Sequence, residues 1–248
     1  MLRKTNKGFY TLTTLSNFKN LVHGFSTKDF GDVRFKIAGT KKNREKLAKV
    51  LNIESEFVGV AQKHGNKVMV VDERDLGKII SGVDGLVTNK PGVNLMIRVA
   101  DCLPILVYDP KNQIVGAAHA GWRGTVAGVA KNLIKKFVND FKSDPGKLLV
   151  GFGPCIEFCH YDVTQERASK IKKAGLGESL LTSITGKIFF DLKRANKGQL
   201  LSEGILSKNI DASIKSCTFE NTDFYSWRRE KPDLSGNFAA VIGLKNEN

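Results

Sequence analysis

The sequence has 248 residues, of which 41% are hydrophobic, 26% charged and 8% aromatic, the composition of an ordinary globular protein. Its longest apolar runs are far shorter than the ~20 residues that span a bilayer, and its basic first residues lead into no apolar stretch, so we expect neither a membrane span nor a secretory signal. The formal net charge is +14, but basic residues are scattered among acidic ones. We therefore expect a solvated lysine-rich surface rather than a nucleic-acid-binding patch.

The hydrophobic pattern predicts helices and strands in a mixed order. In chain order we expect a helix over 41–53, strands over 57–62 and 67–71 on either side of a turn at 64–66, strands over 94–100, 103–108 and 114–119, a helix capped by Thr125 and continuing through Phe137, a strand over 147–152, a helix over 163–173, another within 192–214, and a closing strand over 239–244. Because strands outnumber helices and come in runs, we predict one α+β domain over residues 1–248, with a mixed sheet core and peripheral helices.

The supply of cysteine and histidine is small. The chain has four of each, and without a secretory signal we expect reduced thiols in the cytoplasm. A multicopper oxidase needs a blue-copper site of two histidines and a cysteine, plus further imidazoles for its other coppers. Four histidines cannot supply both, so the sequence argues against that class of enzyme.

Three residues of these types lie at turns attached to predicted strands: His64, Cys102 and His119. Side chains at strand ends can converge from distant parts of the chain, and two imidazoles with one thiolate suit a catalytic zinc ion with an open fourth position. Cys102 and His119 alone would also form a thiolate nucleophile with its base. A packed or solvent-contacting role for each residue is the alternative, because they are not close in sequence.

The other cysteines carry weaker signals. Cys155 and Cys159, followed by His160, imitate a metal-binding knuckle, but a second pair that would complete four ligands is missing. We therefore favour a packing or loop role for them. We interpret Cys217 as a small buried hydrophobic residue.

The segment Gly-Trp-Arg-Gly at 121–124 precedes a predicted helix. Its glycines permit close backbone approach, the helix N-terminus offers free N–H groups, and Arg123 adds a guanidinium, which together favour an anion such as phosphate. Gly121 and Gly124 would equally serve to pack the helix against the sheet. Asp101, next to Cys102, is an acceptor for a ligand imidazole, a proton acceptor or a turn residue.

With these residues the chain resembles the YfiH-like laccase-domain family, also described as multicopper polyphenol oxidoreductases or peptidoglycan editing factors. The resemblance covers nearly the whole chain, and its most specific parts are Ala-Asp-Cys at 100–102 and His-Ala-Gly-Trp-Arg-Gly at 119–124. The other matching motifs are HGFST at 23–27, NR at 43–44, QKHG at 62–65, DG at 84–85, GPCI at 153–156, YDV at 161–163, CT at 217–218 and FYSWRR at 224–229.

The resemblance implies a β-sandwich-like core flanked by helices, as in cytotoxic-necrotizing-factor-like cysteine hydrolases. It implies a metal site, with zinc first and copper as the alternative, whose ligands are His64, Cys102 and His119. It also implies phosphorolysis of purine nucleosides (adenosine, inosine and methylthioadenosine) to the free base and a ribose 1-phosphate, with adenosine deamination alongside. The residues expected to act on substrate and phosphate are Cys102, His119, Asp101 and Arg123 in catalysis, and Lys28, Arg123, Gly121 and Gly124 in binding.

Two positions depart from the family pattern. Lys28 replaces a usual arginine, which keeps the charge but loses the bidentate fork, and Asn237 follows Gly236 where an arginine is usual. Three other functions stay open: a metal-free Cys102–His119 hydrolase that edits peptidoglycan precursors, a polyphenol oxidase, and a basic module that binds nucleic acid or protein. We expect the partners to be a nucleoside and phosphate, not a membrane or nucleic acid.

Overall fold

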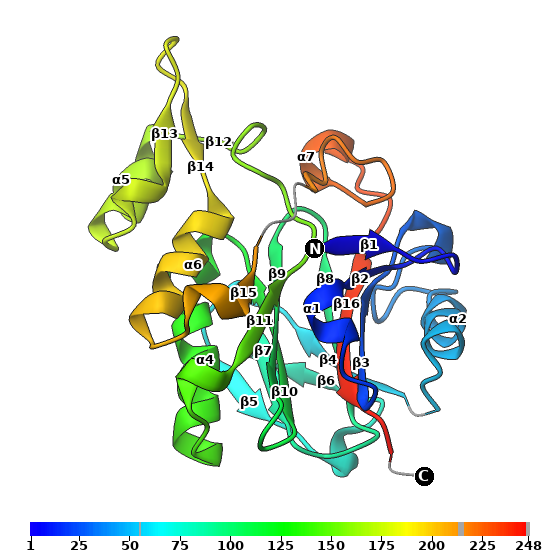
Figure 1. Ribbon diagram of the computed structural model, residues 1–248. Coiled ribbons are helices and arrows are strands. Elements are labelled where there is room, and N and C mark those ends of the chain that lie inside the picture. Colours follow the sequence, from blue (N-terminus) through cyan, green and yellow to red (C-terminus); the bar gives the residue numbers. More distant parts are fainter. Residues whose placement is uncertain (55, 213–215, 247–248) are drawn as a thin grey trace.

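The computed structural model describes residues 1–54, 56–212 and 216–246, and its framework is two mixed β-sheets that lie face to face (Figure 1). The seven-stranded sheet has the order β1-β2-β3-β16-β8-β4-β6, with β1 (Leu2–Lys4), β2 (Tyr10–Leu12), β3 (Leu21–Phe25), β4 (Phe57–Ala61), β6 (Ile79–Ser81), β8 (Asn94–Val99) and β16 (Phe238–Leu244). The six-stranded sheet has the order β15-β11-β9-β10-β7-β5, with β5 (Val68–Val70), β7 (Gly85–Thr88), β9 (Leu103–Asp109), β10 (Ile114–Ala120), β11 (Leu149–Phe152) and β15 (Ile210–Asp211). A small third sheet, β12-β14-β13, consists of β12 (Asp162–Val163), β13 (Leu180–Thr182) and β14 (Ile188–Phe190).

Helices cover the outer faces of the two large sheets (Figure 1). Helix α2 (Lys41–Leu51) packs on the seven-stranded sheet, and α4 (Val129–Phe141) with α6 (Leu192–Ser202) packs on the six-stranded sheet. The remaining helices are α1 (Thr13–Ser16), α3 (Trp122–Val126), α5 (Gln165–Lys173) and α7 (Trp227–Glu230). In the part of the chain that the structure describes, every helix is too short or too polar to cross a membrane.

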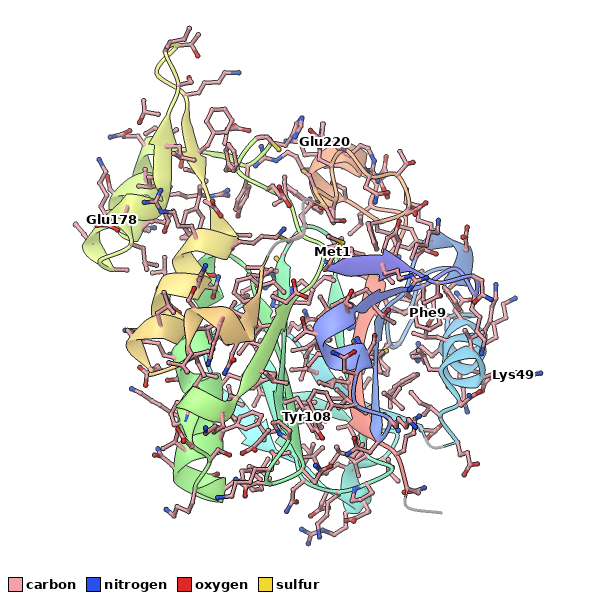
Figure 2. The ribbon with its side chains drawn as sticks, in the orientation of Figure 1. Met1, Phe9, Lys49, Tyr108, Glu178 and Glu220 are labelled. Atoms are coloured by element: carbon pink, nitrogen blue, oxygen red, sulfur yellow. The ribbon has the colours of Figure 1, made fainter. Side chains whose placement is uncertain are left out.

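The main core lies between the two sheets. Phe25, Ile97 and Ile242 from the seven-stranded sheet meet Leu106 and Tyr108 from the six-stranded sheet, and all five are fully buried (Figure 2 labels Tyr108). Every residue of β9 and β10 is buried, because one face of these strands contacts the other sheet and the opposite face contacts helices. This explains their nearly continuous apolar sequences and confirms the expected α+β, sandwich-like fold with flanking helices.

The structure corrects two local predictions. The strands expected around residues 64–66 are present as β4 and β5, but they belong to different sheets, so the loop between them crosses the sandwich. Thr125 does not cap the long helix. It lies inside the short helix α3, and α4 begins after Gly128, whose φ of +83° a residue with a side chain would rarely adopt.

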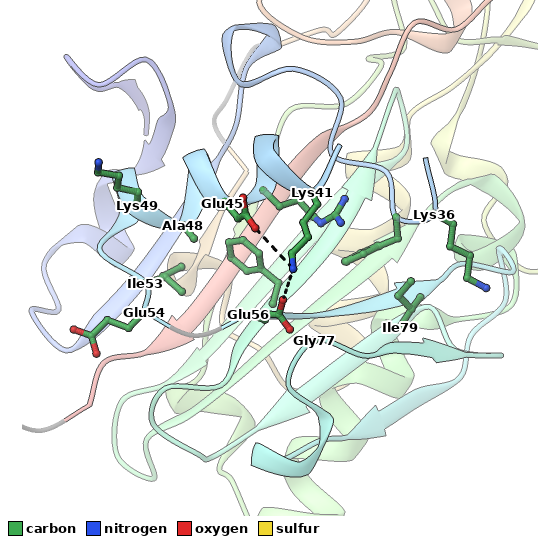
Figure 3. Close-up of a pocket in the computed structure, with 13 residues that line it drawn as sticks. Lys36, Lys41, Glu45, Ala48, Lys49, Ile53, Glu54, Glu56, Gly77 and Ile79 are labelled. Atoms are coloured by element: carbon green, nitrogen blue, oxygen red, sulfur yellow. Dashed lines mark ion pairs between the residues drawn. The ribbon is translucent and has the colours of Figure 1, made fainter. Parts of the chain in front are cut away.

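A cavity of about 570 Å³ lies on the outside of the sandwich, beside α2 (Figure 3). The ammonium of Lys41 lies there 3.9 Å from Glu45 and 3.6 Å from Glu56. Among the described residues, its lining contains neither histidine nor cysteine. This cavity therefore lacks the side chains that the sequence singles out for chemistry.

Thr125 has a structural role that can be tested. Its buried hydroxyl accepts a hydrogen bond from the Asn196 amide (2.9 Å), which joins α3 to α6. Thr125→Val removes this acceptor and leaves a buried N–H without its partner, so we expect a loss of about 1–3 kcal/mol in the free energy of unfolding. Chemical denaturation measures the change, and Thr125→Ser, which keeps the hydroxyl, is the control. Equal losses in both variants would contradict the role assigned to the hydrogen bond.

Candidate functional site

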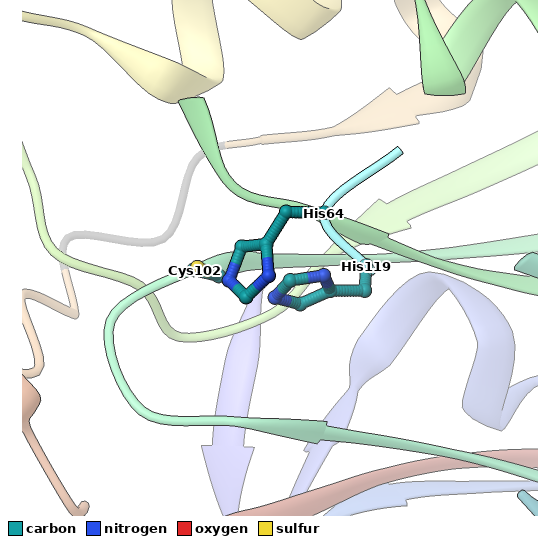
Figure 4. Close-up of side chains that lie close together, drawn as sticks. All are labelled: His64, Cys102 and His119. Carbon is teal, nitrogen blue, oxygen red and sulfur yellow. The ribbon is translucent and has the colours of Figure 1, made fainter. Parts of the chain in front are cut away.

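Strand register brings His64, Cys102 and His119 together. In the antiparallel pair β9–β10, Leu103 lies opposite Ala120 and Pro104 opposite His119, so Cys102 lies beside the end of β10. His64 comes from the loop that crosses between the sheets. The ligand atoms of the three residues lie within 4.8 Å of one another (Figure 4). The two imidazole rings are nearly perpendicular, at 85°, with their centroids 4.8 Å apart.

The buried carboxylate of Asp84 orients two of these side chains. One of its oxygens lies 3.1 Å from Nδ1 of His119, which leaves the other ring nitrogen of His119 free to bind a metal. The backbone N–H groups of Lys63, His64 and Gly65 donate to the same carboxylate at 2.8–3.1 Å. The loop wraps around the carboxylate with His64 at a φ of +58°. Asp84 therefore fixes both the imidazole of His119 and the backbone that carries His64.

The electrostatics of the site favour a charged thiolate and imidazolium. Burial alone would raise the pKa of Cys102, but the charge of His119 and hydrogen bonds from His119 and His64 outweigh it and lower this pKa to about 6. Burial would likewise lower the pKa of His119, but the Cys102 thiolate and the hydrogen bond with Asp84 raise it to about 9. A thiolate of this kind is both a nucleophile and a metal ligand.

The two glycines of the 121–124 segment lie against the site. A Cβ on Gly121 would come within 2.9 Å of Cys102 Sγ and 3.1 Å of the His64 ring. A Cβ on Gly124 would come within 2.9 Å of the Gly65 carbonyl oxygen. The two distances of 2.9 Å are too short for real side chains, so these glycines permit the backbone to pack against the three candidate ligands. Close packing is the structural reason for glycine at both positions.

Asp101 has one of the three roles that the sequence left open, that of a turn residue. It occupies the turn between β8 and β9 with a φ of +86°. Its carboxylate accepts hydrogen bonds from the hydroxyl of Thr218 and the backbone N–H of Arg228, both at 2.6 Å. The imidazole acceptor considered for Asp101 is instead Asp84. Asp101 is a turn residue that fastens the Cys102 turn to the C-terminal part of the chain, and it still lines the cavity.

Lys28, expected at the anion site, lies elsewhere. Its ammonium forms an ion pair with Glu230 at 2.7 Å and lies over the ring of Tyr225. It is absent from the set of described residues that line the cavity at the candidate ligands. Its charge is therefore already paired with a carboxylate. His23, which the sequence left without a role, is buried beside the backbone of Leu12, and burial lowers its pKa to about 4.

The candidate ligands open into a cavity of about 460 Å³. Four arginines and three large aromatic residues share its lining: Arg98, Arg123, Arg167, Arg228, Trp122, Tyr161 and Trp227. The guanidinium groups of Arg123 and Arg167 both lie over the indole of Trp122, at 4.7 and 5.3 Å. Within residues 1–54, 56–212 and 216–246 neither of these two forms an ion pair, whereas Arg228 pairs with Asp162.

Sequence reasoning assigned no role to Asp84, Arg167, Tyr161 or Trp227. A signal existed for Asp84, an acidic residue directly before the apolar strand β7 and part of the DG motif. Its function depends on the pairing of Gly85 with Ala118, which places it opposite His119. Arg167 lies on α5, and no local pattern in the sequence connects that helix to the site.

The assignment of Asp84 predicts a selective effect on metal binding. Asp84→Asn removes the charge that orients His119, and we expect zinc affinity to fall about 10–100-fold. Asp101→Asn is the matched control, because its hydrogen-bond partners are Thr218 and Arg228, and it should leave zinc affinity unchanged. Competition against a chromogenic chelator measures both variants. Equal weakening by the two changes would show that Asp84 has no special position.

Known proteins share both the sequence pattern and the fold. The family model described as multi-copper polyphenol oxidoreductase laccase matches residues 18–245. Purine nucleoside phosphorylase YlmD of Bacillus subtilis is 31% identical, over 94% of this chain and 91% of its own length. Adenosine deaminase RL5, from an unidentified prokaryote, is 33% identical over 74% of each chain. The crystal structure of YlmD from Geobacillus stearothermophilus superposes with a TM-score of 0.91 at 28% identity, covering 99% of both chains. The resemblance inferred from the motifs is thus confirmed, and the chain belongs to the YfiH-like, multi-copper polyphenol oxidoreductase laccase family.

Proposed function

We propose that the protein is a metal-dependent purine nucleoside phosphorylase that acts in the cytoplasm. The observation that carries the proposal is the composition of one cavity. It joins two histidines and a cysteine, two arginines without ion-pair partners among the described residues, and three large aromatic side chains. The relatives named for purine nucleoside phosphorylase and adenosine deaminase activity support the same substrate class.

The donor set fits zinc. Two imidazoles and one thiolate are the ligands of a catalytic zinc site, with a fourth position left for water or substrate. A zinc-bound histidine usually donates its other ring N–H to an acceptor such as a carboxylate, and Asp84 is placed to accept from His119. A zinc ion held by His64, Cys102 and His119 would supply a positive charge to a substrate oxygen or activate a water molecule. Copper is the alternative metal for the same ligands.

Arg123 and Arg167 are our candidates for the phosphate site. Both guanidinium groups line the cavity and lie over the same indole, and each can donate two parallel hydrogen bonds to a phosphate. Arg228 and Arg98 also line the cavity, but Arg228 is paired with Asp162 and Arg98 donates to the carbonyl oxygen of Val60. Phosphate oriented in this way would attack the anomeric carbon of the ribose while the bond to the purine nitrogen breaks. The purine leaves with that electron pair and takes up a proton.

The aromatic residues suit the purine. Trp122, Tyr161 and Trp227 line the same cavity, and Trp227 is half exposed at its rim. Indole and phenol rings offer flat apolar faces on which a base can stack. Arg123 and Arg167 lie over the ring of Trp122, next to these aromatic residues. The cavity therefore provides for a flat base and an anion at neighbouring positions.

Three other activities rank lower. Adenosine deamination needs an activated water in place of phosphate, and one relative carries that name. A Cys102–His119 hydrolase acting on peptidoglycan precursors would use the thiolate without a metal. A polyphenol oxidase needs more imidazoles than the site provides, because His23 is buried in the sandwich and His160 lies with Cys159 and Cys217.

The reaction products separate these possibilities. Pure zinc-loaded protein incubated with adenosine should release adenine only when phosphate is present. Cys102→Ala should abolish both turnover and the tight binding of zinc by His64 and His119, without loss of the fold. Inosine as the product would instead support deamination. Activity on a muramyl-amino-acid substrate that survives chelation would favour the hydrolase, and formation of neither adenine nor inosine would refute the proposal.

The phosphate site predicts a selective change in KM. Arg167→Ala and Arg123→Ala each remove a charged donor, so we expect the KM for phosphate to rise about tenfold or more, with a smaller change in the KM for adenosine. Lys28→Met is the matched control, because this lysine pairs with Glu230, and it should leave both constants unchanged. A rise in phosphate KM for Lys28→Met alone would move the anion site to that lysine.

Lys28→Met should change the stability of the protein at low pH and leave the kinetic constants unaffected. Burial would raise the pKa of Glu230, but the hydrogen bonds from Lys28, Ser235 and the Ser226 backbone, with the charge of Lys28, together outweigh it and lower this pKa from 4.5 to about 2. A carboxylate with a lowered folded-state pKa adds stability above pH 4.5 that is lost as the pH falls towards 2. As the pH is lowered through this window, the melting temperature of the Lys28→Met variant should therefore decrease less steeply than that of the wild type.

A further inference from the structure

A second group of metal-binding side chains lies outside the site described above. Cys159 and His160 belong to the loop between β11 and β12, and Cys217 and Glu220 belong to the segment before α7, near which Figure 2 labels Glu220. The sequence suggested packing roles for these cysteines, and Cys155 is indeed buried and outside the group. Cys217, however, faces Cys159 and His160, with all three ligand atoms within 4.8 Å of one another.

We propose that Cys159, His160, Cys217 and Glu220 form a second metal site that binds zinc or another thiophilic divalent cation. Nδ1 of His160 lies 3.2 Å from Cys159 Sγ, 3.7 Å from Cys217 Sγ and 3.5 Å from a Glu220 oxygen. Cys159 Sγ lies 4.0 Å from the same oxygen. Zinc bonds of about 2.3 Å to sulfur and 2.0–2.2 Å to nitrogen or oxygen, at tetrahedral angles, separate neighbouring donors by roughly 3.3–3.8 Å. The separations of 3.2–4.0 Å between these donors lie close to this range.

Other contacts hold the donors in place. The backbone N–H of Glu157 donates to Cys217 Sγ at 3.4 Å, as N–H groups do towards metal-bound thiolates. The His160 ring stacks on Phe219, with centroids 4.4 Å apart and planes 19° from parallel. The guanidinium of Arg229 binds the carbonyl oxygens of Thr218 and Phe219, which fixes the backbone between Cys217 and Glu220. These donor side chains would therefore need little further ordering to bind a cation.

The donor types indicate the cation. Two sulfurs, one imidazole and one carboxylate at tetrahedral spacing favour zinc over calcium or magnesium, which take oxygen ligands. Deprotonated, the two thiols and the carboxylate would carry three negative charges around one neutral ring, which a divalent cation offsets. Cys159 and Glu220 are exposed and Cys217 is buried, so the site is open to solvent on one side and closed by protein on the other.

A cation here would join two segments that line the cavity. Tyr161 directly follows His160, and the guanidinium of Arg228 donates to the carbonyl oxygen of His160 and to Asp162. All donors of this site come from protein side chains, so its role is structural. It would hold the aromatic and cationic wall of the cavity in position, whatever reaction the cavity catalyses.

Metal counting tests the proposal without any assay of turnover. Protein purified under reducing conditions and loaded with zinc should hold about two zinc ions per chain after desalting. Cys102→Ala should retain one, Cys159→Ser should retain one, and the double variant should retain none. Cys155→Ala, a neighbouring thiol outside the group, is the matched control and should retain both ions. Removal of the second ion should also lower the melting temperature in the wild type but not in Cys159→Ser.

Cobalt provides a second readout that does not depend on how well Cys159→Ser folds. Cys102→Ala loaded with Co²⁺ should show the visible bands of tetrahedral coordination and the sulfur charge-transfer absorption of bound thiolates. Absence of zinc and of these bands in Cys102→Ala would overturn the proposal. Alkylation and mass spectrometry would give a second contradicting result if protein that had been reduced and then reoxidised held a disulfide between Cys159 and Cys217 in place of a bound ion. That result would also overturn the proposal.

Discussion

The pairing of β9 with β10 is the constraint on which the rest of the site depends. Both strands are buried on both faces, so a slip of one residue would reverse every side chain across the core and is strongly disfavoured. The register that results puts Pro104 opposite His119 and Cys102 against Gly121. The neighbouring strand β7 then places Asp84 where it meets His119. Rigid packing far from solvent thus sets the geometry of polar groups at the edge of the sheet.

Much of this arrangement could be predicted from local sequence. The apolar runs of β9 and β10 and the 3.6-residue period of α4 each reflect burial that neighbouring residues share. His64, Cys102 and His119 could be selected because metal-binding residue types stand next to strand ends, and the family motifs support the same choice. What local patterns could not supply was the assignment of strands to sheets. β4 and β5 look like neighbours in sequence, but the structure places them in different sheets.

The residues that escaped prediction depend on contacts between distant segments. Asp84 acquires its role through a pairing with β10, and Thr125 faces α6 instead of starting a helix, because Asn196 donates to it across the layer. Cys217 looks like an ordinary small core residue until the loop carrying His160 folds over it. The net charge also carried no information about the site. An excess of lysine over the whole surface says little about the arginines at the cavity, and Lys28 is neutralised by Glu230.

The crossing loops have a thermodynamic consequence for the whole sandwich. His64 lies where the chain passes from β4 to β5, and Cys102 lies where it passes from β8 to β9, so each is tethered to both sheets. An ion held by these side chains and His119 would be a crosslink between two layers that otherwise cohere through apolar contact. By linkage, the affinity for the metal and the free energy that holds the two sheets together are then coupled. A substitution deep between the layers would be felt as weaker metal binding, and loss of the metal would loosen the layers first at this edge.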